Sequence, residues 1–100
     1  MSVEGSWQLV IDSPIGKQHV TVRIEQDGGV LSGTLKNNDN GLVTDIFDGS
    51  VNGDTLQWKV TLKQMKMTLT FNTSVDQDSM TGKVKAGLFG RFNVHGEREP

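Results

Sequence analysis

Short runs of alternating apolar and polar residues, separated by turn-forming residues, are the feature of this sequence that most limits its fold. In the clearest run, TLQWKVTLK, the apolar residues from Leu56 to Leu62 alternate with polar ones. Turn signals such as DGG at 27–29 and NGD at 52–54 recur about every ten to fourteen residues. Because the side chains of a strand point alternately to its two faces, this pattern is typical of an all-β chain.

The pattern predicts eight strands, each with one apolar and one polar face, as in antiparallel sheets. The expected strands cover residues 6–12, 17–26, 30–36, 42–51, 55–63, 66–73, 79–86 and 89–98. Since short connections pair sequential neighbours, we expect an antiparallel up-and-down eight-stranded barrel, which leaves no exposed strand edge. A β-sandwich is the alternative architecture. The chain of 100 residues is expected to form a single β-barrel domain over residues 1–100.

The expected strand at 42–51 departs from simple alternation, because neither set of alternate positions in GLVTDIFDGSV is purely apolar. A bulge at Gly49 would reverse the alternation and let both Ile46 and Val51 reach the core. Asp45 or Asp48 would then lie near a barrel rim. An inward carboxylate in an apolar barrel has a raised pKa and can act as a general acid or base. The alternative is that Asp48 and Gly49 only form the bulge or a turn.

The first and last strands are predicted to meet, because the eighth strand of an antiparallel barrel runs back beside the first. The alternation that places Trp7 inside also places Arg98 inside, at the same end. A guanidinium stacked on an indole contributes ~0.5–2 kcal/mol. The Arg98 side chain can also donate hydrogen bonds to exposed carbonyl groups there. We therefore expect Trp7 and Arg98 to close one end of the barrel.

The segment Gly5-Ser6-Trp7 opening the first strand, with Arg98 late in the last, resembles the calycin superfamily of lipocalins, fatty-acid-binding proteins and avidins. The length and the meander are most similar to the avidin-like branch. The segments DGGVLSGTL and GKVKAGLFGRFNVHGER also resemble small bacterial barrel proteins without an assigned function. The resemblance implies a barrel closed at one end by Trp7 and Arg98. It does not imply biotin binding, since the hydroxyl- and tryptophan-rich set that holds biotin in avidins is not recognisable, and neither is the lipocalin helix.

An eight-stranded barrel is narrow enough for side chains to fill and wide enough to hold one small ligand. The expected function is binding of a small apolar molecule in the interior. One alternative is a small barrel enzyme of isomerase or cyclase type that uses an inward Asp. Another is a structural or interaction module with a filled core, forming a homodimer through a barrel wall. The candidate ligand-binding residues are Trp58, Met67, Phe71, Met80, Phe92, Asp45 and Asp48.

Composition argues against several other functions. There is no cysteine, so thiol catalysis, disulfides and thiolate metal sites are unavailable. His19 and His95 are predicted to face outward on strands separated by the first strand, without a third ligand, so we expect no metal and no cofactor. The net charge of -2 provides no overall attraction to nucleic acid or to an anionic membrane. Because we find neither a signal-peptide pattern nor a run of ~18 apolar residues, we expect a cytoplasmic protein without a membrane partner.

A local group of lysines is expected on the outer face of the strands from 55 to 86. It lies among threonines and lacks the exposed aromatic residues on which single-stranded nucleic acids stack. A solvated surface is therefore favoured over a nucleic-acid site. The lysines are Lys59, Lys63, Lys66, Lys83 and Lys85.

Overall fold

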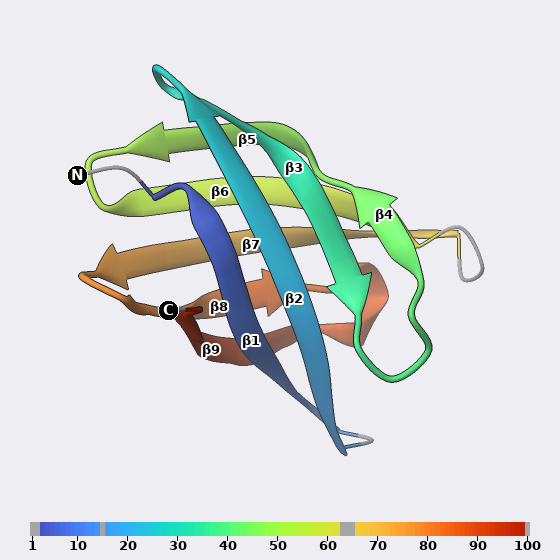
Figure 1. Ribbon diagram of the computed structural model, residues 1–100. Coiled ribbons are helices and arrows are strands. Elements are labelled where there is room, and N and C mark those ends of the chain that lie inside the picture. Colours follow the sequence, from blue (N-terminus) through green and yellow to red (C-terminus); the bar gives the residue numbers. More distant parts are fainter. Residues whose placement is uncertain (1–2, 15, 63–65, 100) are drawn as a thin grey trace.

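The computed structural model describes residues 3–14, 16–62 and 66–99, and their strands form one closed antiparallel sheet (Figure 1). Each strand pairs with its neighbour along the barrel wall, and the pairing of β2 with β3 and of β1 with β9 closes the wall. The up-and-down barrel is thus confirmed, and the sandwich is excluded. The elements are β1 (Gly5–Ser13), β2 (Gly16–Asp27), β3 (Val30–Asn37), β4 (Val43–Asp45), β5 (Phe47–Asn52), β6 (Thr55–Leu62), β7 (Met67–Asp76), β8 (Ser79–Lys85), the short 3-10 helix η1 (Gly87–Phe89) and β9 (Arg91–Arg98).

The fourth position of the barrel is shared by β4 and β5, where the sequence predicts one strand. The register shifts between Phe47 and Ser50, and Asp48 has a positive φ of 51°. Ile46 on one side of this irregularity is 6% exposed, and Val51 on the other packs against the core. The predicted bulge is therefore present, and it lets both side chains face inward as expected.

Three glycines allow the sheet to bend tightly enough to close. If Gly33, Gly82 or Gly96 carried a Cβ atom, it would lie 1.8–2.1 Å from a carbonyl oxygen of the neighbouring strand. Side-chain carbon atoms cannot approach oxygen so closely, so only glycine fits at these positions. Glycines of this kind mark sharp bends in barrel strands.

The barrel has two different ends. The Trp7 end carries the connections β2–β3, β5–β6 and β7–β8 and the first and last described residues. The far end carries the connections β1–β2, β3–β4, β6–β7 and β8–β9, the last of which contains η1. In Figure 1 the chain termini lie at the left, at the Trp7 end, and the far end lies to the right.

Trp7 and Arg98 pack on each other at the Trp7 end, where they are directly paired across β1 and β9. The Arg98 guanidinium carbon lies 4.5 Å from the centre of the Trp7 ring, and the Trp7 Nε1 donates to the Val3 carbonyl oxygen at 3.0 Å. Arg98 also donates to the Asp78 carboxylate and to the carbonyl oxygens of Glu4 and Gln77. This set of contacts ties three segments of the chain together.

A continuous apolar cluster lies inside the barrel and is built from the inward residues of the barrel strands. Alternation of inward apolar and outward polar side chains is what the period of a strand dictates. In the part of the chain that the structure describes, no helix has the length and apolar character to cross a membrane.

Candidate functional site

The centre of the barrel interior is an aromatic pair on adjacent strands. Trp58 of β6 and Phe71 of β7 are directly paired, and their rings stack with centroids 5.1 Å apart and an angle of 11° between the planes. Both side chains are fully buried. The same row of cross-strand pairs continues through Val84 of β8 to the half-buried Phe92 of β9. One face of the interior is therefore a belt of large apolar side chains.

Two polar atoms in this interior are buried without a hydrogen-bond partner in the structure. They are the indole Nε1 of Trp58 and the hydroxyl oxygen of Thr73. Thr73 lies two residues beyond Phe71 on β7, on the diagonal from Trp58, and such diagonal positions are roughly 7–8 Å apart. Leaving a buried donor or acceptor unpaired costs ~1–3 kcal/mol. This pair of polar atoms is the candidate site.

Thr73 is not among the residues that the sequence predicts for the site, although the alternation of β7 contains the signal. The inward positions of β7 follow the order 67, 69, 71, and the next position in that order is 73. The expected strand ends at residue 73, and the sequence alone assigns no role to a threonine at the end of a strand. The strand extends to Asp76, so Thr73 lies well inside the barrel wall.

The other apolar candidates do not gather at one place. Met80 is fully buried, but it pairs with Val75 and Gly96, close to the Trp7 end. Met67 begins β7 at the far end and is half-buried. The two methionines therefore lie toward opposite ends of the barrel, and the aromatic pair separates them.

Neither candidate carboxylate faces the interior. Asp45 pairs with Thr34 on the outer face of β3 and β4 and is exposed. Asp48 is exposed at the bulge, with one carboxylate oxygen 3.8 Å from the Lys59 Nζ. The alternative in which one of these carboxylates faces inward is therefore wrong. The other alternative holds, in which Asp48 and Gly49 only form the bulge: it turns Asp48 outward while it brings Val51 inward. An enzyme that uses either carboxylate inside the barrel has no basis here.

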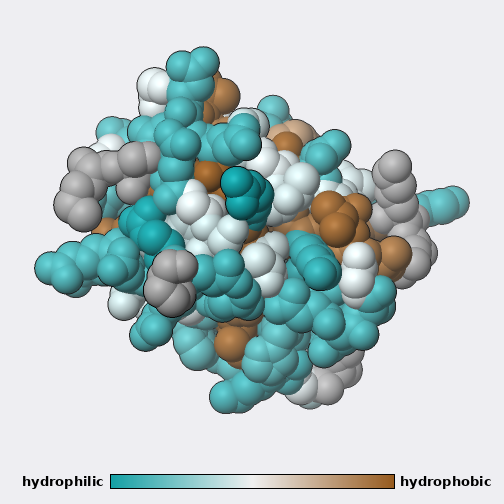
Figure 2. All heavy atoms as spheres, in the orientation of Figure 1, coloured by the Kyte–Doolittle hydropathy of each residue, from teal (hydrophilic) through white to brown (hydrophobic). Residues whose placement is uncertain are grey.

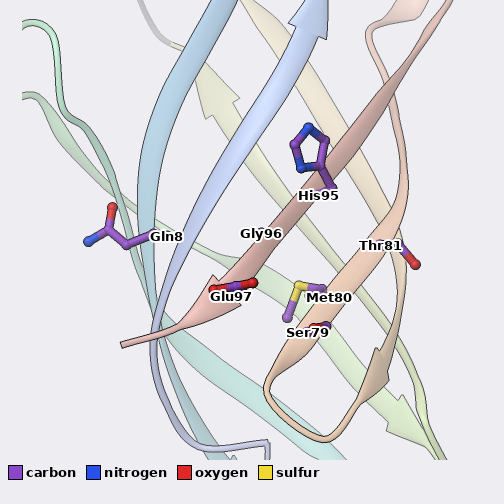
Figure 3. Close-up of a pocket in the computed structure, with 7 residues that line it drawn as sticks. All are labelled: Gln8, Ser79, Met80, Thr81, His95, Gly96 and Glu97. Carbon is purple, nitrogen blue, oxygen red and sulfur yellow. The ribbon is translucent and has the colours of Figure 1, made fainter. Parts of the chain in front are cut away.

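A shallow hollow of about 440 Å³ on the outer surface crosses β1, β9 and β8 (Figure 3). Figure 3 shows Gln8 and Thr81 pointing to opposite sides of it, away from each other. The Gln8 side chain is bonded to Glu99, Thr21 and Asn38. His95 lies 3.8 Å from Asp12, too far for a hydrogen bond. The polar groups around this hollow do not converge on one point, so it offers no catalytic arrangement.

His19 and His95 are both exposed, on β2 and β9, with β1 between them. Within residues 3–14, 16–62 and 66–99, no group of three or more His, Cys, Asp or Glu residues is arranged to hold a metal ion.

Of the lysines predicted on the outer face, Lys63 lies outside the described residues. Of the other lysines in the outer group, Lys66, Lys83 and Lys85 are exposed and Lys59 is partly buried.

We expect Thr73→Val to raise the free energy of unfolding of the ligand-free protein by about 1 kcal/mol, because it replaces an unpaired buried hydroxyl with a methyl group of similar size. Urea unfolding followed by tryptophan fluorescence measures the change. Thr81→Val, which replaces an exposed hydroxyl on β8, is the matched control and should leave stability nearly unchanged. A loss of stability in Thr73→Val would show that its hydroxyl has a partner.

Comparison with known proteins supports the fold. No protein-family model matches the chain, and no curated protein matches it. A solved structure of a redesigned beta barrel is similar to it, with a TM-score of 0.79 over 98% of this chain and 92% of that chain. The two sequences are 11% identical, so the similarity shows the fold alone. The chain is thus a small closed antiparallel β-barrel.

Proposed function

We propose that this barrel binds a small, mainly apolar molecule in its interior, in the manner of calycin-type binding proteins. The observation that carries the proposal is the pair of buried, unpartnered polar atoms on Trp58 and Thr73. A ligand with one carbonyl or hydroxyl group would accept a hydrogen bond from Trp58 Nε1 and pair with the Thr73 hydroxyl. The favourable part of its binding energy would come from contacts with the surrounding apolar side chains.

The surroundings of Trp58 favour a neutral ligand. Among the described residues, the inward-facing positions of the strands carry a single charged side chain, that of Arg98. It packs on Trp7 at the end of the barrel. A carboxylate placed beside Trp58 would lose its hydration without gaining a nearby cation, which is strongly unfavourable.

The indole resonances of the protein test this proposal directly. The chain has 2 tryptophans, and Trp7 Nε1 already donates to Val3, so its proton-nitrogen resonance is an internal control. We expect titration with 2-heptanone to shift the Trp58 resonance downfield and leave the Trp7 resonance in place. Heptanoate, which has the same chain length and a negative charge, should produce a much smaller shift.

The Trp58→Phe variant assigns the indole resonance, since its ring lacks the N–H donor. Thr73→Val should weaken 2-heptanone binding while it stabilises the ligand-free protein. If neither probe shifts the Trp58 resonance, the interior is filled and the proposal fails. If the shifts are confined to outward residues, the probes bind the surface, and the proposal fails as well.

A further inference from the structure

Charged side chains are segregated between the two ends of the barrel. At the Trp7 end, carboxylates clearly outnumber cations. The only cations that the structure describes there are Arg23 and Arg98, and Arg98 is bonded to Asp78. The carboxylates of this end are Glu4, Glu25, Asp27, Asp54, Asp76, Asp78, Glu97 and Glu99.

The far half of the barrel has the opposite balance. Its described carboxylates are Asp12, Asp39 and Asp45. Asp48 and Lys59, near the middle of the wall, lie 3.8 Å apart and offset each other. The protein is therefore polarised along the barrel, although its net charge is only -2. The cations of this half are Lys17, Lys36, Lys66, Lys83, Lys85 and Arg91.

Among the described residues, three exposed large apolar side chains lie at this basic end, whereas Val30 lies at the Trp7 end and Phe47 on the barrel wall. Phe89, in the connection between β8 and β9, is 68% exposed. Leu42 and Val43, where the chain enters β4, are 50% and 60% exposed. Figure 2 shows brown side chains gathered on the side of the molecule where Figure 1 draws β4. The far end thus combines exposed apolar groups with a positively charged surround.

Three of the cations surround one hollow at the base of the connection that carries Phe89. The hollow, of about 380 Å³, lies on the outer face of β7, β8 and β9 and is lined by Asn72, Gly82, Lys83, Lys85 and Arg91. Lys85 and Arg91 are directly paired across the two strands, and Lys83 Nζ donates to the Asn93 side chain at 3.0 Å. Such a group of cations suits a phosphate group.

We propose that the far end of the barrel docks on the surface of an anionic lipid bilayer. Phe89 enters the interfacial layer, and Lys83, Lys85 and Arg91 contact headgroup phosphates. An exposed aromatic side chain beside cations is what binding at a charged membrane surface requires, since the apolar contact and the electrostatic attraction add. Nucleic acid would satisfy the cations but offers little to Leu42 and Val43. The proposal does not depend on ligand binding in the interior.

Co-sedimentation with vesicles tests the proposal. The full-length protein is mixed with vesicles of phosphatidylcholine alone, or of phosphatidylcholine and phosphatidylglycerol in equal parts. We expect binding to the mixed vesicles only, and weaker binding at high salt. Lys85→Gln combined with Arg91→Gln should lower the partition coefficient about 25-fold, since each basic residue near the surface contributes about a fivefold factor. Phe89→Ser should lower it by about fivefold or more.

Two control variants separate this surface from general effects of charge and apolarity. Arg23→Gln removes an exposed cation at the Trp7 end, and Phe47→Ser removes an exposed aromatic side chain from the barrel wall. Both should bind the mixed vesicles as the unmodified protein does. In addition, Phe89→Trp should give tryptophan emission that is quenched by brominated lipid chains, whereas Trp7 and Trp58 are fully buried.

Several results would overturn the proposal. These are equal binding to both kinds of vesicle, equal losses in Arg23→Gln and in the double variant, or Phe89→Trp emission that brominated lipid does not quench. Binding to single-stranded DNA in place of vesicles would assign the basic end to nucleic acid. Head-to-tail association of copies without lipid, seen by sedimentation velocity and lost in the double variant, would assign it to the acidic end of a second copy.

Discussion

Gly82→Ala is expected to lower the free energy of unfolding by about 3 kcal/mol or more, enough to leave much of the protein unfolded at moderate urea concentration. A Cβ atom at this position would lie 2.1 Å from the Asn72 carbonyl oxygen and 2.6 Å from the Thr73 Cα. Both are backbone atoms of β7, so no side-chain rotation can relieve the overlap. β7 and β8 would have to separate where they form the wall beside the aromatic pair.

Gly29→Ala is the matched control for this variant. A Cβ atom at Gly29 would lie 3.7 Å from the Val51 carbonyl oxygen, an ordinary contact, and Gly29 does not have a positive φ. We expect its stability to stay within about 0.5 kcal/mol of the unmodified protein. Urea unfolding followed by tryptophan fluorescence compares the two. Equal stability of the two variants would refute the interpretation of Gly82 as a required bend.

Arg98→Met is expected to destabilise the protein by about 2–3 kcal/mol, because the variant loses the guanidinium contacts that join β9 to the N-terminal segment and to the β7–β8 connection. Methionine keeps most of the aliphatic length of the side chain. The guanidinium is only partly buried, which limits the contribution of its pairing with Asp78. Arg91→Met, on an exposed residue of the same strand, should change stability much less.

A double-mutant cycle with Trp7→Phe measures the stacking itself. Trp7→Phe removes the hydrogen bond to Val3 and part of the ring that Arg98 covers. If the two residues act together, the combined variant is less destabilised than the sum of the single variants, by about 1 kcal/mol. Additive effects would mean that Arg98 acts through its backbone partners alone.

Most of the barrel wall was predictable from the sequence, because the alternation of inward and outward side chains is a local property of each strand. It placed Trp58 and Phe71 inside and His19 and His95 outside, and it paired Trp7 with Arg98 once the strand count was known. The bulge at Gly49 was also predictable, since only a reversal of the alternation lets both Ile46 and Val51 face inward.

The candidate site was only partly predictable. Alternation specifies the face of the sheet but not the position along the barrel axis, so it grouped Met67 and Met80, which lie toward opposite ends. Whether the Trp58 indole finds a hydrogen-bond partner depends on residues from other strands. Thr73 became notable only because the structure leaves its hydroxyl buried and unpaired.

The sequence by itself determined the all-β class, the eight positions of the barrel wall, most of the inward residues and the meeting of Trp7 with Arg98, because these follow from the period of a strand and the direction of successive strands. Only the tertiary structure decided that Asp45 and Asp48 face outward, that Gly82 approaches the backbone of β7, and that charges are segregated between the two ends. Those properties depend on distances between strands and on which connections share an end. Residues as distant in sequence as Lys17 and Arg91 come to the same half of the barrel only when its wall closes.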